Sequence, residues 1–74
     1  MELGENQITS IALDNNLALE HLNLYGNQLS SIDVSNNQAL TYLSLGANSF
    51  TGIDISLNSL LTDLLVFNND LNTL

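Results

Sequence analysis

The chain contains no Lys, no Arg, no Cys and no Pro, whereas eight Asp and Glu residues and one His give it a formal net charge of −8. Without cationic side chains it lacks the means to bind nucleic-acid phosphates, to hold a phosphorylated substrate or to attach to a membrane through a polybasic patch. Without cysteine it has no disulfide framework, no thiolate nucleophile and no zinc site built on sulfur, and the redox compartment stays undecided. Nucleic-acid binding and phosphate chemistry are therefore excluded as functions.

Long apolar runs are also missing. The longest, Leu64 to Phe67, has four residues, against the roughly 20 that a membrane-spanning helix needs. The opening residues, Met1 to Glu5, carry acid where a secretory signal carries base, and no apolar segment follows them. Because a chain of 74 residues buries only ~60% of its unfolded surface, we expect one soluble domain with a thin core and no membrane insertion.

Leucine and asparagine are in excess, with 17 Leu and 12 Asn among 74 residues. Aligning the sequence with itself gives an offset of 21 residues, and each unit divides into halves of 10 and 11. Each half carries an apolar-x-apolar triplet followed three residues later by asparagine. Residues 1–74 thus form a single array without evident caps, with units 1–21, 22–42, 43–63 and a partial unit 64–74.

The triplets predict short strands. Two apolar side chains two positions apart face the same side of an extended segment, and one such strand is too short to bury them alone. Copies in the same phase stack as parallel strands ~4.8 Å apart and supply the core together. The sequence predicts an all-β-rich repeat solenoid of about 3.5 turns, with a first ladder near 1–3, 21–25, 42–46 and 63–67 and a second, shorter ladder near 10–13, 31–34 and 52–55.

Two columns of asparagine follow the strands where the chain turns inward. An amide there can bond the backbone groups that the turn leaves unpaired, and amides one turn apart can bond each other. We therefore interpret both columns as structural rather than catalytic: Asn6, Asn27, Asn48 and Asn69 in the first, and Asn16, Asn37 and Asn58 in the second.

The first half of each unit resembles the leucine-rich-repeat family. The family pattern LxxLxLxxNxL begins at Leu19, Leu40 and Leu61, and the match covers essentially the whole chain. The stretch 32–37 resembles the short bacterial variety of 21 residues, although Ala12 replaces the aspartate of the later units. The resemblance implies a solenoid with a parallel β-sheet on one face that serves as a recognition scaffold, in an extracellular or cell-surface bacterial protein.

The outward face of the first ladder is the candidate binding surface. The leucines of the triplets point inward, so the alternate residues point to solvent. Three of the four aromatics lie on this face, where a rigid sheet makes them favoured contact anchors, and Phe50 is expected in the core. The alternative is that Tyr and Phe simply suit strands, but an exposed apolar pair at Leu65 and Phe67 favours binding. The outward face comprises His21, Asn23, Tyr25, Tyr42, Ser44, Asp63, Leu65 and Phe67.

Asp33 and Asp54 occupy equivalent positions in the second ladder, so their carboxylates are expected ~5 Å apart. Such proximity opposes the ionisation of both groups and predicts a raised pKa for a solvated pair. A bridging calcium ion is the weaker alternative, because calcium requires about six to eight oxygens and a flat surface offers two carboxylates with nearby serines. No other metal and no cofactor is predicted.

His21 is the candidate for general-base catalysis. Its neighbour across the ladder is Tyr42, while Asp63 lies two strands away at ~10 Å, too far to orient an imidazole as a catalytic triad requires. A flat sheet offers no pocket, and the sequence has no Gly-rich phosphate loop. We therefore predict that the protein is not an enzyme.

These observations favour a non-enzymatic protein-interaction or ligand-binding module whose partner is a neutral or basic protein or glycan. The first alternative is a structural protein that stacks end to end into filaments, because an array without caps exposes leucines and strand edges at both ends. Eight negative charges per added subunit oppose unlimited stacking. The second alternative is a scaffold without a ligand, either designed or trimmed from a longer array.

Overall fold

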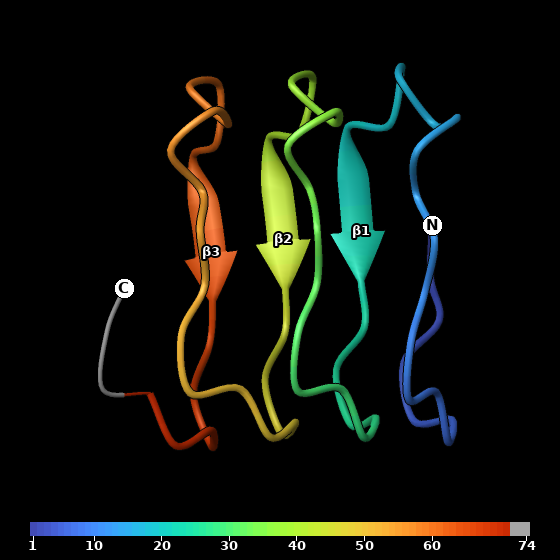
Figure 1. Cartoon of the computed structure of the whole chain (residues 1–74), viewed down its shortest axis with the longest axis vertical. Helices are drawn as coiled ribbons and strands as arrows, with labels where there is room; N and C mark the ends of the chain where they lie inside the picture. The colour runs from blue at the N-terminus through green and yellow to red at the C-terminus, as the bar shows by residue number, and fades with distance from the viewer. Residues whose placement is uncertain (72–74) are drawn as a thin grey trace.

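The computed structural model describes residues 1–71 and contains one open parallel sheet. Its strands are β1 (His21–Asn23), β2 (Tyr42–Ser44) and β3 (Asp63–Leu65), in the order β1-β2-β3 (Figure 1). Glu2 adds an isolated parallel bridge to Asn23. No helix is formed within residues 1–71. The parallel sheet predicted for the first ladder is confirmed at these three strands, and the last part of the partial unit, 72–74, lies outside the described residues.

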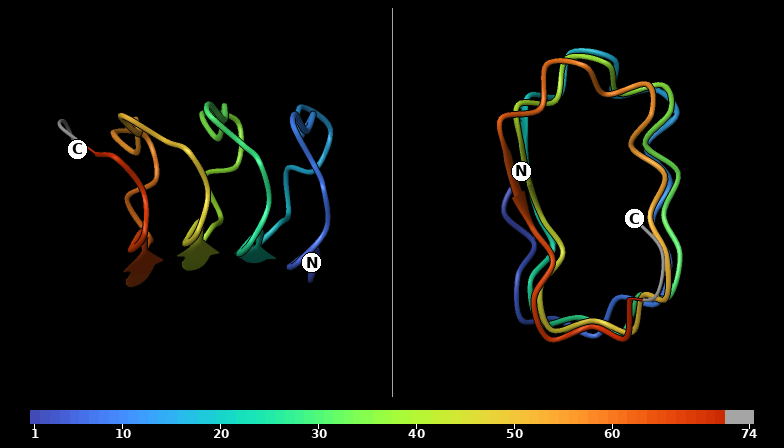
Figure 2. Two further views of the ribbon diagram at one scale, coloured as in Figure 1. Left: turned by 90° about the horizontal axis from the view of Figure 1, so that it is seen from below. Right: turned by 90° about the vertical axis from the view of Figure 1, so that its left-hand side faces the viewer.

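The strands pair with a register of 21 residues, so that Leu22 lies beside Leu43 and Leu43 beside Leu64. Viewed along the stack, successive turns of the chain superimpose closely (Figure 2). Backbone hydrogen bonds between turns continue past the strands, from Leu24 N–H to Ser44 O at 2.8 Å and from Ser49 N–H to Leu29 O at 2.8 Å. The sequence period therefore equals the length of chain between neighbouring strands.

The strands end sooner than predicted, after three residues instead of five. After β1 the Tyr25 N–H donates to the side-chain oxygen of Asn23 at 3.0 Å instead of pairing with another turn. The chain then turns at Gly26, whose φ of +74° suits a residue without Cβ. Ala47 and Asn68 adopt a positive φ after β2 and β3. A residue with a positive φ thus follows each strand at the same position of the repeat.

The predicted second ladder is wrong. Segments 10–13, 31–34 and 52–55 contain no strand, and no backbone hydrogen bond joins one of these segments to another. The alternating pattern does report burial, since Leu13, Val34 and Ile53 lie in the core. Backbone groups that could pair in a ladder are hydrogen-bonded to side chains instead. The Asn37 side chain donates to Leu13 O at 3.1 Å, and Ser35 N–H donates to the Asp33 carboxylate at 3.0 Å. Side-chain periodicity fixes which residues face inward, but it does not require the backbones to pair.

The core is best covered in the middle of the stack. Leu43, Leu45 and Phe50 are fully buried, as are Leu22 and Leu24 on the preceding turn. On the first and last turns the equivalent apolar side chains are only partly buried, and they include Leu3, Ile8, Leu64, Val66 and Leu71. Burying one leucine contributes roughly 1.5–3 kcal/mol, so the middle turns supply most of the hydrophobic stabilisation. Phe50 lies in the core as predicted.

Candidate binding face

The outward face combines three rows of side chains that the strand register aligns. His21, Tyr42 and Asp63 form the first row. Asn23, Ser44 and Leu65 form the second. Tyr25 and Phe67 follow the strands, and between them Gly46 follows β2. The sheet therefore brings together residues that lie up to 46 positions apart in the sequence, from His21 to Phe67.

Tyr25 and Phe67 converge although they lie on turns that are not adjacent. Their ring centroids are 5.8 Å apart, with the planes at 45°. A Cβ on Gly46 would lie 3.1 Å from Tyr25 Cδ2 and 3.2 Å from Phe67 Cζ, so both rings close over the space that this glycine leaves free. Tyr25 is 36% exposed and Phe67 53% exposed. The result is an apolar pair that is open to solvent and held in place by its own contact.

Ser44 does not belong to the exposed surface, and this prediction is wrong. It occupies the outward row between Asn23 and Leu65 but is only 4% exposed. Ser44 carries a short side chain on the central strand, with larger side chains on both neighbouring strands, so its neighbours cover it. Alternation gives the direction of a side chain, whereas exposure also depends on the size of its neighbours.

His21 makes two contacts on the sheet. Its ring stacks on that of Tyr42, with centroids 4.2 Å apart and planes at 2°. On the other side, His21 Nε2 and Glu2 Oε2 are hydrogen-bonded, and Asn23 Nδ2 donates to Glu2 Oε1 at 2.8 Å. Hydrogen bonds from Asn23 first and His21 second hold the pKa of the Glu2 carboxyl below its ordinary value of 4.5. The imidazole is thus oriented by a ring and a carboxylate.

Glu2 also belongs to this group, because the repeat places it in the outward row of Asn23. It precedes Asn23 by one repeat length, and this offset places it next to β1. The signal was the alignment of Met1 to Leu3 with the later triplets. Asp63, on the other side of Tyr42, makes no side-chain hydrogen bond within residues 1–71 and is exposed. The outward face therefore has a paired carboxylate at the β1 edge and a free one at the β3 edge.

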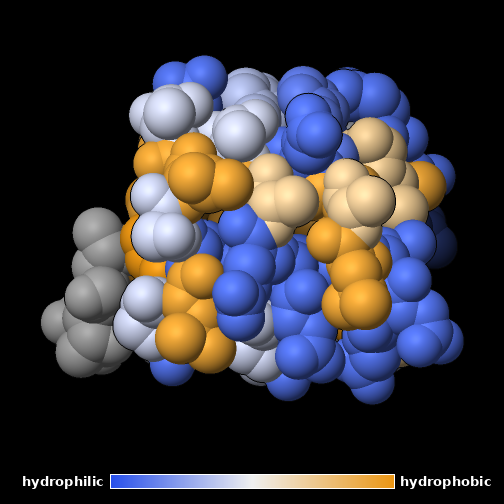
Figure 3. Space-filling view, turned by 90° about the horizontal axis from the view of Figure 1, so that it is seen from above, coloured by the Kyte–Doolittle hydropathy of each residue, from blue (hydrophilic) through white to orange (hydrophobic). Residues whose placement is uncertain are grey.

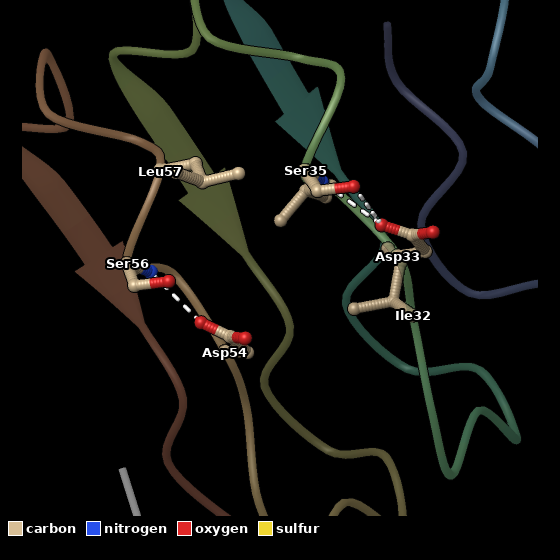
Figure 4. A pocket seen from close by; sticks show the side chains of 7 residues that line it. Ile32, Asp33, Ser35, Asp54, Ser56 and Leu57 are labelled. Atoms are coloured by element: carbon tan, nitrogen blue, oxygen red, sulfur yellow. Dashed lines mark hydrogen bonds between the residues drawn. The ribbon is translucent and has the colours of Figure 1, made fainter.

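The Asp33 and Asp54 side chains line a cavity of about 250 Å³, together with Ile32, Ser35 and other residues (Figure 4). Asp33 Oδ1 accepts hydrogen bonds from Ser35 N–H at 3.0 Å and from Ser35 Oγ at 2.6 Å. These bonds, the hydroxyl first, hold the pKa of Asp33 below its ordinary value of 3.8, and the charge of Asp54 opposes them more weakly. Ser56 lowers the pKa of Asp54 likewise.

The predicted rise in the pKa of this pair is therefore wrong. Repulsion between two solvated carboxylates is weak, whereas each carboxylate accepts hydrogen bonds from a serine two residues further along. Within residues 1–71 no group of three or more potential metal-ligating side chains is found. Two carboxylates alone fall short of the oxygen ligands that calcium requires.

The asparagine side chains bond the backbone, and in the second column this includes the backbone carbonyl of the preceding asparagine. Asn48 donates to Leu24 O and Leu45 O at 2.9 and 3.0 Å, and its Oδ1 accepts from Leu29 N–H at 3.0 Å. Asn27 and Asn69 repeat this pattern, whereas Asn6 donates to Leu3 O and Gly4 O of its own turn. In the second column the donors are Asn37 and Asn58. Asn16 lies on the first turn and is exposed.

Sequence reasoning missed a second group of exposed apolar side chains, Leu17, Leu57 and Leu60. They lie in the turns that precede the strands, on the side of the molecule seen in Figure 3, where hydrophobic surface is interspersed with hydrophilic surface. Each departs from its repeat, since Leu60 replaces Ala39 and Leu57 replaces Asn36 at the equivalent positions. These departures from the repeat are the sequence signal that could have identified the three leucines.

Within residues 1–71 no helix is long and apolar enough to cross a membrane. Comparison of the chain with protein-family models, with curated proteins and with solved structures finds no match.

Proposed function

We propose that the chain is a repeat solenoid of the leucine-rich type that acts as a non-enzymatic binding module through its outward face. The observation that carries this proposal is the Tyr25–Phe67 pair, which is exposed and whose rings contact each other over Gly46. Large aromatic side chains held in position lose little conformational entropy on binding and are frequent anchors of interfaces. A location outside the cell follows from the resemblance to the short bacterial repeats.

The repeat architecture is supported by the agreement between the sequence period and the strand register, both of 21 residues. It is supported further by Asn27, Asn48 and Asn69, each of which bonds its own turn and the preceding one. Such nearest-neighbour contacts are the basis of stability in stacked repeats.

The test is a screen of the full chain against arrays of proteins and glycans, with paired variants. Phe67→Ser removes one ring of the outward face, and Leu60→Ser is the matched control, since Leu60 is exposed to a similar extent, 58% against 53%, and lies away from this face. We expect partners that bind the wild type and Leu60→Ser but lose about tenfold in affinity for Phe67→Ser. Circular dichroism verifies that both variants fold. If partners bind Phe67→Ser but not Leu60→Ser, the binding surface is the second group of exposed apolar side chains, to which Leu60 belongs, and not the outward face.

End-to-end self-association is the second candidate function. It is favoured by the partly buried apolar residues on the first and last described turns, such as Leu3 and Leu64, which are equivalent to fully buried residues of the middle turn. Light scattering over a concentration series tests it. A mass that rises with concentration, and more steeply when salt screens the acidic charge, supports stacking, whereas a constant monomer mass rejects it.

A further inference from the structure

We propose that the outward face binds an extended cationic peptide segment of a partner protein, with a Lys or Arg side chain against Asp63 and a neighbouring apolar side chain against Leu65 and the Tyr25–Phe67 pair. This inference rests on the proposed function and names the partner class of the same site. It commits to a peptide rather than a glycan.

Charge complementarity is the first argument. The chain has no Lys or Arg, so a carboxylate or phosphate of a partner finds no cationic side chain apart from a protonated His21. Of the carboxylates on the face, Glu2 is already bonded to His21 and Asn23. Asp63 is exposed and its carboxylate accepts no hydrogen bond within residues 1–71. Asp63 is therefore the group with free capacity for a partner's cation.

Spacing is the second argument. Asp63 and Leu65 are alternate residues of β3, which puts a carboxylate and an aliphatic side chain on the same face roughly 6.6 Å apart, and Phe67 follows after the strand. An extended peptide presents every second side chain at the same interval. A cation and an apolar residue separated by one position in the peptide thus meet Asp63 and Leu65 together.

The shape of the aromatic pair is the third argument. The Tyr25 and Phe67 planes are inclined at 45°, so they form an angled surface rather than a flat platform on which a sugar ring could stack. An angled pair fits the branched or aromatic side chain of a peptide. The open ring edges and faces also suit the alkyl stem of Lys or the guanidinium of Arg.

The experiment is a selection from a displayed library of random short peptides on the immobilised full chain. Enriched peptides are then measured against four variants. Asp63→Asn and Phe67→Ser alter the outward face; Asp54→Asn and Leu60→Ser are the matched controls, because they make the same changes of charge and of exposed apolar surface elsewhere. Circular dichroism of each variant checks the fold.

We expect enriched peptides to carry Lys or Arg two positions away from an aliphatic or aromatic residue, with one residue between them. Their affinity should fall about tenfold for Asp63→Asn and for Phe67→Ser, and stay unchanged for Asp54→Asn and Leu60→Ser. Replacing the cation of the best peptide by citrulline or norleucine should reproduce the loss seen with Asp63→Asn.

Three results would overturn the inference. If the enriched peptides are neutral and their binding depends on Phe67, the partner is not cationic, but the outward face is still a binding surface. Equal losses of affinity for Asp63→Asn and Asp54→Asn would show that the peptide is attracted by the net negative charge of the whole chain and not by Asp63. If no enriched peptide depends on the outward face, the partner is not a peptide, and the glycan array decides the proposed function by itself.

Discussion

The two asparagine columns place the same residue at corresponding positions of the two half-repeats, on opposite sides of the molecule, and they are bonded differently. On the sheet side, the Asn48 amide donates to two turns and its oxygen accepts from Leu29 N–H. On the opposite side, the amides of Asn37 and Asn58 donate likewise, but their buried oxygens have no hydrogen-bond partner among the described residues. The sheet side is also joined by backbone hydrogen bonds between turns.

The difference teaches that repetition of a residue does not guarantee repetition of its contribution. An amide whose NH2 group and oxygen are both hydrogen-bonded stabilises two turns. A buried amide oxygen without a partner loses its hydration, and no hydrogen bond offsets that loss. We therefore expect the sheet side to be the more stable half of each turn.

Substitution of the two asparagines should give the largest contrast. Asn48→Ala leaves Leu29 N–H and three carbonyls without their side-chain partner, which should lower the free energy of unfolding by about 3 kcal/mol. Asn58→Ala loses two donations but removes the unsatisfied oxygen, so we expect about 1 kcal/mol. Urea denaturation measures both values. Equal losses would contradict the contrast between the two sides.

Hydrogen exchange compares the two sides without any substitution. Leu45 and Val34 are both almost fully buried, but Leu45 N–H donates to Leu65 O at 2.7 Å, whereas the Val34 N–H makes no backbone hydrogen bond to another turn within residues 1–71. We expect the Leu45 amide to exchange at least about tenfold more slowly than that of Val34. Similar rates, read by NMR, would mean that burial alone governs protection.

The pH dependence of stability should single out Asp33 on the side away from the sheet. Its pKa is lowered in the folded state, so its hydrogen bonds to Ser35 stabilise the fold above pH 3.8 and are lost as pH falls through the lower, folded value. Asp33→Ala should thus be less stable than the wild type near neutral pH, and the difference should shrink toward about pH 3. Asp63→Ala, whose carboxylate accepts no hydrogen bond within residues 1–71, is the control. Thermal melts across this range provide the measurement; a difference independent of pH would argue against the Ser35 bonds.

Gly46→Ala should have the smallest effect on stability and a visible one on the outward face. The added methyl lies 3.1–3.3 Å from atoms of the Tyr25 and Phe67 rings, which are partly exposed and can move by a few tenths of an ångström. We expect a loss of about 0.5 kcal/mol with shifted ring resonances of Tyr25 and Phe67 in NMR spectra. Unchanged resonances would show that the two rings do not close over Gly46.

The register of the sheet could be predicted because the repeat specifies it. Once Leu22, Leu43 and Leu64 fall in the same phase, only one alignment of the strands buries all of them, since a slip by one residue would turn them to solvent. The burial of Phe50 follows from the same phase. The burial of Ser44 could not be predicted in this way, because it depends on how the side chains of two neighbouring turns fill the space around it.

The sequence by itself determined the period, the phase of each apolar residue and the composition of the surface, which lacks lysine and arginine. These properties are local, because alternation and spacing are carried by a few consecutive residues. Only the tertiary structure decided that the second set of triplets does not pair, that Glu2 bonds to His21, and that Tyr25 meets Phe67 across Gly46. Each of these depends on competition among groups from different turns for the same space or the same hydrogen bond, and such competition arises only when the turns are stacked.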